Sequence, residues 1–368
     1  MIGKGYCNIL LIQLGDIGDV VLTTSAIRAL RETYPAARVS IMVRKPFGSL
    51  LTADPNIFHV IEHSKVRGSF FNVLSQHARF VTQLRKARHD LVIDLRTGDR
   101  GAILSFCTGA KERVGLYVDG KERWHNLLFT NTIRDAPVGL PTDHPGADQS
   151  LRILRSMGIV TKSSDPKIYV APADRKRAVK LLADCGLSSG VRWITVNPFS
   201  RWPYKEWDYG KWGQVMDSLW ERHRLRSLLI GSQEEYSAAA AISEGRKGCT
   251  FNFAGKTSLG ELAAILSMST LHLGVDSAAP HITAAVGTPT ITIHGPSDWR
   301  AWRVINDMHK VVISPMACVP CHRMGCSDSG RSICLDELEM QSVLDVVEEM
   351  LSSTCGAIPH GDRFEDPS

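Results

Sequence analysis

The sequence predicts an α/β protein of two doubly wound domains, each built on a parallel sheet covered by helices. Short apolar runs typical of buried strands alternate with segments of helical spacing along most of the chain. This alternation starts again at Trp193, after a turn-rich stretch. The length of 368 residues is too great for one ordinary core, and 43% hydrophobic with 22% charged residues is typical of a soluble globular protein.

The first domain opens with a strand–helix–strand unit. A strand from Asn8 to Leu14 leads into a segment whose apolar residues have helical spacing, and a second apolar run begins at Val39. The glycines that follow the strand, Gly15 and Gly18, do not form G-x-G-x-x-G. The dinucleotide-binding fingerprint is therefore absent, and a nicotinamide-dependent enzyme loses the main sequence evidence in its favour.

Two carboxylates follow this first strand. Asp16 and Asp19 lie where open α/β sheets place ligands, but Asp also caps helix N-termini well, and the segment alone favours capping. A later strand, Leu91 to Leu95, is followed by cations that we expect on the same side of the sheet as Asp19. They are Arg96, Arg100, Lys111 and Arg113.

The domain boundary is predicted at a short turn, CGLSSG, which starts at Cys185. This gives domains at 1–186 and 187–351, followed by a loose tail at 352–368. The segment from Asn131 to Ser150 lacks periodicity and is predicted to be a long loop. A last amphipathic helix is expected from Asp336 to Leu351.

The two halves carry opposite excess charge. Residues 1–186 hold 27 Lys and Arg against 17 Asp and Glu, whereas residues 187–368 hold 16 against 21. A basic half suits an acidic partner, either a phosphorylated lipid surface or nucleic acid. The run from Arg175 to Lys180 supplies part of this excess and is better explained as a solvated helix face.

The second domain contains the stretch that binds an anion most readily. From Leu271 to Gly295 the sequence predicts a strand, a polar turn at Asp276 and Ser277, a short helix and another strand. Such a turn directs unpaired backbone N–H groups and the positive end of a helix dipole at its ligand. The simplest ligand for this site is a phosphate.

Four cysteines lie close together near the end of the second domain. Cys318, Cys321, Cys326 and Cys334 form C-x2-C-x4-C-x7-C, of which only the first pair has metal-ligand spacing. A structural metal and a set of reduced thiols are equally well supported.

The compartment is predicted to be the cytoplasm. The chain has nine cysteines, an odd number, and its N-terminus lacks the organisation of a signal peptide. No stretch approaches the roughly 20 apolar residues needed to span a bilayer.

Several separated segments together resemble glycosyltransferase family 9, the ADP-heptose:lipopolysaccharide heptosyltransferases. The resemblance extends to about Leu351. In order, the segments are LGDIGDVVLTTSAIRALRETYP, DLRTGDRGAILSFCTGAKERVG, NPFSRWPYKEW, LLIGSQEE, FAGKTSLGELAAILS, GVDSAAPHITAAVGTPTITIHGPS and the cysteine loop. Their joint occurrence in this order is specific for the family, though not for one member.

The resemblance implies a GT-B fold, in which two Rossmann-like domains face each other across a cleft, and an inverting transfer that needs no metal. The family's Gly-Asp-Val motif maps onto Gly18, Asp19 and Val20, so Asp19 rather than Asp16 inherits the role of general base. A carboxylate there can accept the proton of an acceptor hydroxyl as its oxygen attacks the anomeric carbon.

The donor-binding residues also follow from the resemblance. The family's phosphate-binding hydroxyl and lysine map onto Ser200 and Lys205, and its Asp-Ser/Thr-Gly-x-x-His motif maps onto Asp276, Ser277, Ala278 and His281. Asp276 is better suited to a ribose or sugar hydroxyl, or to holding His281 or the loop, than to the phosphates. Glu234 or Glu235 is expected to reach the ribose. Ala278 replaces the family's usual glycine and narrows the room for the diphosphate.

The acceptor is expected to be a phosphorylated glycolipid at the inner membrane surface. Lipopolysaccharide inner core carries phosphates and acidic Kdo sugars, which Arg96, Arg100 and Arg113 could orient, with Arg44 and Lys45 as further candidates. The expected enzyme is therefore a cytoplasmic or peripheral monomer that uses a nucleotide sugar and neither cofactor nor nucleic acid. Two alternatives remain: a family member that transfers another sugar to a different glycan or glycolipid, and a non-catalytic nucleotide- or glycolipid-binding protein of the same fold.

Overall fold

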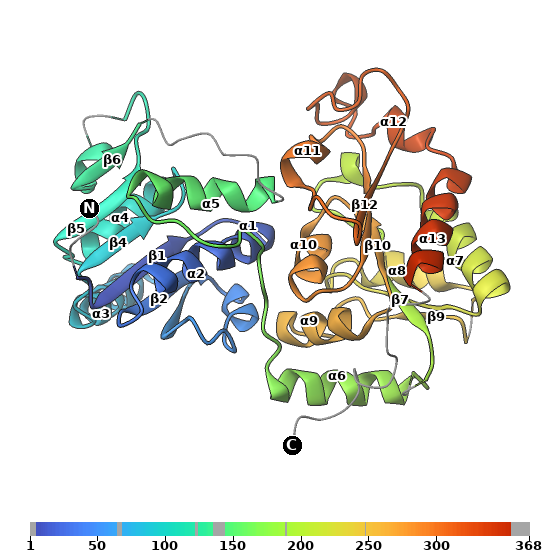
Figure 1. The fold of residues 1–368 in the computed structure, drawn as a ribbon, viewed down its shortest axis with the longest axis horizontal. Helices are drawn as coiled ribbons and strands as arrows, with labels where there is room; N and C mark the ends of the chain where they lie inside the picture. Colours follow the sequence, from blue (N-terminus) through green and yellow to red (C-terminus); the bar gives the residue numbers. More distant parts are fainter. Residues whose placement is uncertain are drawn as a thin grey trace. The chain divides into compact units, whose positions relative to one another are not determined.

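The computed structural model describes residues 5–64, 68–121, 124–134, 144–187, 190–246 and 248–354. It divides into two compact units, Met1–Tyr169 and Val170–Ser368. Each unit contains a six-stranded parallel sheet with helices packed against it (Figure 1). The predicted α/β class and doubly wound sheets are confirmed.

The first unit is built around the sheet β3-β2-β1-β4-β5-β6. Its strands are β1 (Asn8–Gln13), β2 (Arg38–Arg44), β3 (His59–His63), β4 (Leu91–Asp94), β5 (Glu112–Leu116) and β6 (Asn131–Ile133). Its helices are α1 (Ile17–Leu22), α2 (Thr24–Thr33), α3 (Phe70–Lys86), α4 (Asp99–Cys107) and α5 (Pro145–Ser156), with 3-10 turns η1 (Phe47–Leu50) and η2 (Asn126–Leu128).

The central strand of this sheet is buried on both faces. In β1 the four residues from Ile9 to Ile12 are fully buried, because successive side chains point to opposite faces and helices cover both. Leu10 and Ile12 pack on one face with Leu84 of α3 and Leu104 of α4. This packing fixes the register of β1 against β4, where Ile9 pairs with Leu91.

The segment that was expected to be one long loop, Asn131 to Ser150, contains regular structure at both ends. Its first residues form β6, which pairs with β5, and its last residues belong to α5, which starts at Pro145. Proline fits the first turn of a helix because its missing N–H has no helical partner there. The long-loop prediction is therefore wrong at both ends, and residues 135–143 lie outside the described structure.

The second unit repeats the arrangement with the sheet β12-β11-β10-β7-β8-β9. Its strands are β7 (Trp193–Asn197), β8 (Arg226–Leu229), β9 (Thr250–Asn252), β10 (His272–Val275), β11 (Thr290–His294) and β12 (His309–Ile313). Its helices are α6 (Pro172–Asp184), α7 (Tyr209–His223), α8 (Tyr236–Ser243), α9 (Leu259–Met268), α10 (Ala278–Ala285), α11 (Trp299–Trp302), α12 (Ile333–Asp336) and α13 (Met340–Thr354), with 3-10 turns η3 (Pro203–Lys205) and η4 (Cys326–Asp328).

The C-terminal helix completes the core of this unit. Val343, Leu344 and Val347 of α13 are fully buried in the cluster that contains Trp207 and Trp212. The predicted helix from Asp336 to Leu351 corresponds to α13, which starts later than predicted, at Met340, whereas Asp336 is the last residue of the preceding helix, α12. The predicted tail at 352–368 begins as the last turn of α13, and residues 355–368 lie outside the described structure.

Helix α6 belongs to the second unit, because it packs against α9. Asp174 lies against Gly260, where a Cβ would come within 2.2 Å of the carboxylate, and Arg177 Nε contacts Glu261 Oε1 at 2.6 Å. The compact units accordingly divide between Tyr169 and Val170, whereas the sequence placed the boundary at 186/187. The basic run of α6 is therefore counted with the second unit and not with the first.

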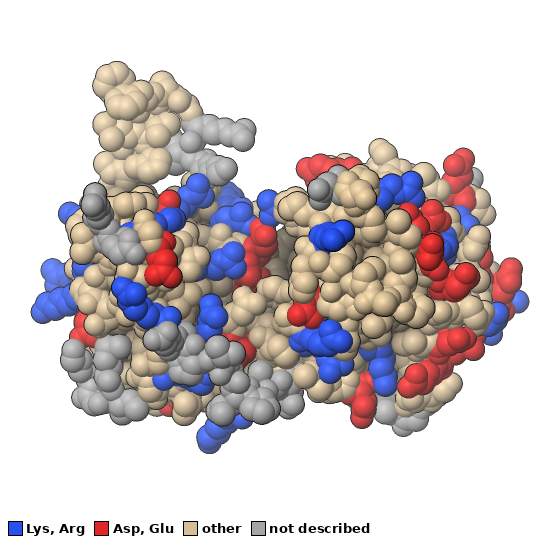
Figure 2. Space-filling model, turned by 90° about the horizontal axis from the view of Figure 1, so that it is seen from above, with Lys and Arg blue, Asp and Glu red and all other residues tan. Residues whose placement is uncertain are grey.

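Charged side chains are distributed differently on the two units. Figure 2 shows acidic side chains gathered on the second unit, in keeping with the acidic excess of residues 187–368. No helix among the described residues is both long enough and apolar enough to cross a membrane.

Candidate active site

The two sheets have the same strand order and therefore the same switch point. In each, the chain passes from one half of the sheet to the other between two central strands, β1 and β4 in the first unit and β7 and β10 in the second. Open α/β sheets bind ligands at the carboxyl ends of such strands. Most of the predicted site residues follow these four strands.

Asp19 follows β1 and is held at both carboxylate oxygens. Its Oδ2 accepts a hydrogen bond from the backbone N–H of Asp16 at 2.8 Å, which caps α1, and its Oδ1 lies 3.0 Å from Arg96 Nη1. Gly15 leaves room for this arrangement, because a Cβ at that position would come within 2.3 Å of Asp19 Oδ2. Asp16 is the N-cap of α1 and Asp19 closes its capping box, so the capping that the sequence suggested is present. Asp19 also forms an ion pair that the sequence did not predict.

The remaining cations of the first unit have different surroundings. The side chain of Arg96 is 46% exposed although it pairs with Asp19, and Arg44 pairs with Asp16. Arg100 is exposed on α4. The pKa of His63 is lowered mainly by burial and to a smaller extent by the charge of Arg100, which therefore lies close to it. Arg96 and Arg100 therefore lie at the carboxyl edge of the sheet, where they were expected.

Arg113 is not brought to this edge. It lies in the first half of β5, paired with Val92, and its guanidinium donates to the backbone carbonyls of Leu128 at 2.8 Å and Ala110 at 2.5 Å. The expectation that Arg113 gathers beside Asp19 is wrong, because register places it inside a strand and local carbonyls satisfy it.

Asp94, at the end of β4, is a buried carboxyl that the sequence analysis did not single out. Its Oδ1 accepts the backbone N–H of Arg96 at 3.2 Å, and its Oδ2 has no hydrogen-bond partner among the described residues. Burial raises the pKa of Asp94 to about 8 against the weaker effect of Arg96. The Asp94 carboxyl thereby fixes the backbone that carries Arg96.

In the second unit, Lys205 and Asp276 form the central contact. Lys205 Nζ lies 2.6 Å from Asp276 Oδ2, and the two side chains are 20% and 10% exposed. Burial alone would raise the pKa of Asp276, but His294 and Lys205 act in the opposite direction and lower it to about 2. Burial lowers the pKa of His294 to about 4, so Lys205 is the cation that faces Asp276 at neutral pH.

Two serine hydroxyls surround this pair. Ser200 Oγ donates to the backbone carbonyl of Asp276 at 3.3 Å, which ties the loop after β7 to the turn after β10. Ser277 Oγ accepts from Asn197 Nδ2 at 2.9 Å. The structure thus brings together Ser200, Lys205, Asp276 and Ser277, as the sequence predicted.

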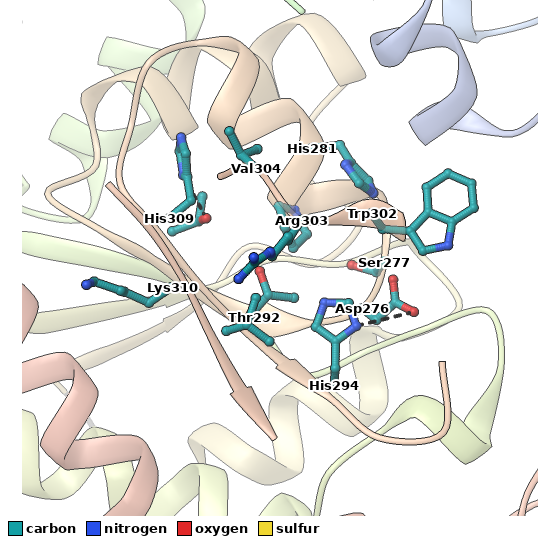
Figure 3. Close-up of a pocket in the computed structure, with 13 residues that line it drawn as sticks. Asp276, Ser277, His281, Thr292, His294, Trp302, Arg303, Val304, His309 and Lys310 are labelled. Atoms are coloured by element: carbon teal, nitrogen blue, oxygen red, sulfur yellow. Dashed lines mark hydrogen bonds and ion pairs between the residues drawn. The ribbon is translucent and has the colours of Figure 1, made fainter. Parts of the chain in front are cut away.

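His281 lines a pocket beside these groups. The lining of the pocket includes Asp276, Ser277, His294 and Arg303 (Figure 3). The ring of His281 meets the ring of Trp302 edge-on, with centroids 6.3 Å apart. Asp276 lies nearest to a different histidine, His294, whose Nδ1 is 3.9 Å from Oδ2.

Ala278 opens α10 with an ordinary backbone conformation. It follows the N-cap Ser277, which is extended, and it is not among the residues with positive φ. The residue at this position therefore needs no glycine for conformational reasons. The effect of Ala278 is restricted to the space that its Cβ occupies.

The two glutamates after β8 differ in their engagement. Glu235 Oε2 accepts the backbone N–H of Ser232 at 2.6 Å, which closes the turn before α8. Glu234 is exposed, and hydrogen bonds from its own backbone and from Ser232 lower its pKa. Glu234 is therefore the better placed of the two to meet a ligand.

The cysteine loop is docked on the loops that follow β7 and β11. Ser332 Oγ donates to the carbonyl of Tyr204 at 2.6 Å, and His322 N donates to the carbonyl of Pro296 at 2.8 Å. Burial and the neighbouring thiols raise the pKa of Cys334 to about 11. Within the described residues, Cys318, Cys321, Cys326 and Cys334 are free thiols and do not form a group arranged to hold a metal.

Three residues of the candidate site were missed in the sequence: Asp94, Asn197 and His294. Each is a polar residue at the last position of a buried strand. That position is the available signal, because the carboxyl end of a parallel strand faces the ligand edge.

The family model described as glycosyltransferase family 9 (heptosyltransferase) matches residues 77–330. Lipopolysaccharide heptosyltransferase 3 of Escherichia coli (strain K12) is 29% identical over 293 residues, which cover 77% of this chain and 82% of that protein. A family 9 glycosyltransferase from Veillonella parvula DSM 2008 superposes with a TM-score of 0.78 at 20% identity, covering 95% and 98% of the two chains.

The structure of ADP-heptose lipopolysaccharide heptosyltransferase II of E. coli is also similar. Its TM-score is 0.75 at 18% identity, and the match covers 94% of this chain and 99% of that one. At this identity the likeness establishes the fold, which is of the GT-B type.

Proposed function

Because the chain belongs to glycosyltransferase family 9, we propose that it transfers a heptose, or a closely related sugar, from a nucleotide sugar to a lipopolysaccharide inner-core acceptor. ADP-heptose is the favoured donor. The names of the relatives support this choice, since they include lipopolysaccharide heptosyltransferases 2 and 3 and an ADP-heptose enzyme. The acceptor would place the reaction at the cytoplasmic face of the inner membrane.

The observation that carries the proposal is the convergence of diphosphate-binding groups in the second unit. Lys205 supplies an ammonium, Ser200 and Ser277 supply hydroxyls, and α10 starts directly after Ser277 with its unpaired N–H groups. An ammonium, hydroxyls and a helix N-terminus together are suited to a diphosphate.

These groups would act on the leaving group of the reaction. As the bond between the anomeric carbon and the diphosphate oxygen breaks, that oxygen gains negative charge, and preorganised donors stabilise this state more than the ground state. Lys205 would contact the diphosphate while it stays close enough to Asp276 to keep that carboxylate ionised. Asp276 is then available to accept a sugar or ribose hydroxyl. These groups would neutralise the leaving diphosphate without a metal.

Asp19 would supply the base for the acceptor. The acceptor hydroxyl oxygen forms a bond to the anomeric carbon from the face opposite the diphosphate, its proton passes to Asp19, and the configuration is inverted. Arg96 orients the carboxylate through the 3.0 Å contact. Because Arg96 and Arg100 are exposed, they can also meet the phosphates or carboxylates of an inner-core acceptor.

Substitution of the base tests this assignment. Asp19→Asn should lower kcat by about 10²–10⁴-fold, the usual contribution of a positioned general base, while donor affinity is kept. Asp16→Asn is the matched control, because Asp16 lies in the same turn but its side chain is 60% exposed. Wild-type turnover by the Asp19→Asn protein would remove the base assignment.

A thermal-shift panel of nucleotide sugars tests the donor. A donor that binds the folded state at 100 times its Kd adds about 2.7 kcal/mol to the free energy of unfolding. ADP-heptose should stabilise the protein more than UDP- or GDP-sugars at equal concentration. A larger shift from another nucleotide sugar would indicate a family member with a different donor.

A further inference from the structure

The first half of α3 stands out from the first unit as an apolar projection. In this segment, Phe70 to Arg79, every residue except Val73 is exposed. The fully buried side chain of α3, Leu84, lies in its second half. We refer to Phe70–Arg79 as the α3 projection.

The projection extends from the end of β3. His63, the last residue of that strand, packs its ring against Phe80 with centroids 5.3 Å apart. Ten helical residues precede Phe80, and at 1.5 Å per residue they make about 15 Å of helix before this contact. The exposure of these residues follows from their position beyond the body of the unit.

Large apolar side chains cover the start of the projection. Phe70, Phe71 and Leu74 are 74%, 80% and 57% exposed, and the two rings meet edge-on with centroids 5.8 Å apart. Exposed apolar groups of this size, clustered within two turns, are typical of an interaction surface.

Cations surround the base of the projection. Arg100 lies close to His63, because its charge lowers the pKa of that imidazole in addition to the larger effect of burial. Lys45 donates its backbone N–H to the His63 carbonyl at 3.0 Å, and the Lys45 side chain is exposed. Helix α3 itself carries Arg79 at the base of the projection and contains neither Asp nor Glu, while its other cations, Arg85 and Lys86, lie in its last turn. A neighbouring acid, Glu62, is engaged with the backbone N–H of Gly48. The surface around the projection therefore favours an anionic partner.

We propose that the α3 projection docks the protein on an anionic lipid bilayer, with Phe70, Phe71 and Leu74 inserted at the boundary between headgroups and acyl chains. An amphipathic helix with aromatic and leucine side chains on one part and cations on another binds membrane interfaces in this way. The shape supports a bilayer over a protein partner, because three side chains on a convex helix end offer far less than the roughly 800 Å² per partner of a stable interface.

The docking surface lies at the same edge of the sheet as the candidate base. The α3 projection follows the carboxyl end of β3, while Asp19 and Arg96 follow the carboxyl ends of β1 and β4. If the acceptor is a membrane-bound glycolipid, docking at this edge would bring the acceptor close to Asp19, and this statement rests on the proposed function. Binding to lipid does not depend on turnover and is measured separately.

Vesicle cosedimentation tests the proposal. The wild-type chain should bind vesicles of phosphatidylethanolamine with phosphatidylglycerol, bind neutral phosphatidylcholine vesicles more weakly, and lose affinity as salt rises. The triple variant F70S/F71S/L74S should bind the anionic vesicles at least tenfold more weakly. These vesicles contain neither donor nor acceptor, so a failed transferase assay would leave this result intact.

Phe58→Ser is the matched control. Phe58 is 62% exposed, but it precedes β3 at the opposite end of that strand and lies under the guanidinium of Arg38. This variant should bind vesicles like the wild type, and both proteins should keep the wild-type melting temperature. Equal binding by the triple variant, or an equal loss in Phe58→Ser, would overturn the proposal.

Two further measurements separate lipid docking from other roles of the projection. Light scattering should give the same molar mass for the wild type and the triple variant, since a fall in mass would identify a contact between copies of the chain. The triple variant should keep turnover on a soluble acceptor analogue and lose it on acceptor embedded in vesicles. Loss on both would assign the residues to the acceptor site instead.

Discussion

The two switch points have the same topology but opposite electrostatic arrangements. In the first unit a carboxylate, Asp19, is held by an arginine whose side chain is 46% exposed. In the second unit a lysine, Lys205, is held by Asp276, and the two side chains are 20% and 10% exposed. The pKa of Asp276 is lowered to about 2, so this carboxylate is ionised at neutral pH. The first edge presents a carboxylate beside a cation that solvent reaches, whereas the second presents a partly buried cation beside a buried carboxylate.

Under the proposed function, this difference would divide one fold between two substrates. Buried charges are held in place and act strongly because the surroundings screen them little, which suits a leaving group that gains charge. Exposed cations are screened more but exchange partners easily, which suits an acceptor that must enter and leave. The same strand order 3-2-1-4-5-6 supports both.

The largest effect is expected at the buried pair. Lys205→Ala should lower kcat/KM for the donor by about 10²–10³-fold, because it removes a preorganised cation from the leaving diphosphate. It also leaves the Asp276 carboxylate buried without its partner, so the free energy of unfolding should fall by about 3–5 kcal/mol. Steady-state kinetics and urea unfolding measure the two losses.

A second substitution separates the two losses. The double variant K205A/D276N removes the unpaired charge and should recover most of the stability while turnover stays low. Lys176→Ala, which removes an exposed lysine on α6, should change neither quantity. Recovery of turnover in the double variant would contradict a direct role for Lys205.

The next effect concerns buried titratable groups, whose pH dependence has opposite sign in the two units. Burial raises the pKa of Asp94 to about 8 and lowers that of His272 to about 3. Between pH 4 and 8 the folded state keeps the Asp94 proton that the unfolded state has lost, so stability falls as pH rises. Between pH 6.5 and 3 the unfolded state protonates the histidine first, so stability falls as pH drops.

Neutral replacements should remove each slope separately. Asp94→Asn should abolish a loss on the order of 3–5 kcal/mol between pH 4 and pH 8, and His272→Gln should reduce the loss of similar size on the acid side. Melting temperatures across pH 3–9 measure both. If the Asp94→Asn protein lost as much stability between pH 4 and pH 8 as the wild type, Asp94 would be ionised in the folded protein.

A smaller effect is expected at the exposed cations of the first unit. Arg100→Glu should raise the acceptor KM by about tenfold or more, because it replaces a charge-assisted contact with repulsion, and should leave the donor KM unchanged. Arg113→Ala is the comparison, since its guanidinium is bound to backbone carbonyls. That variant should lose stability and keep the acceptor KM.

The sequence predicted the sheets because their strands are continuous apolar runs bounded by turns. The resemblance to family 9 implied that Ser200, Lys205, Asp276 and Ser277 act together. The structure brings them together because residues that follow central parallel strands meet at one edge. The sequence failed for Arg113, because spacing along the chain does not show how far into a strand a residue lies.

The sequence also could not predict which side chains pair with each other. The Asp19–Arg96 pair joins residues from two strands that are adjacent in the sheet but far apart in the chain. Pairing of this kind is set by sheet register and by the Asp94 hydrogen bond that holds the Arg96 backbone. Neither leaves a local pattern. The edge strand β6 was missed for a related reason, because its three residues are too short to show a period.

The smallest effect is expected at Ala278, the residue that replaces the glycine usual in the family. Ala278→Gly should change kcat/KM for the donor by less than about threefold, because the position has no positive φ and lies in the first turn of α10. The change acts on two separate quantities: removing the Cβ adds room for the diphosphate, which affects donor kinetics, and glycine at a helix position lowers the free energy of unfolding by about 0.5–1 kcal/mol relative to alanine. Donor kinetics and melting temperature measure the two quantities. A gain of tenfold or more would show that the Cβ obstructs the donor, and the second switch point would then be less preorganised than the Lys205–Asp276 pair indicates.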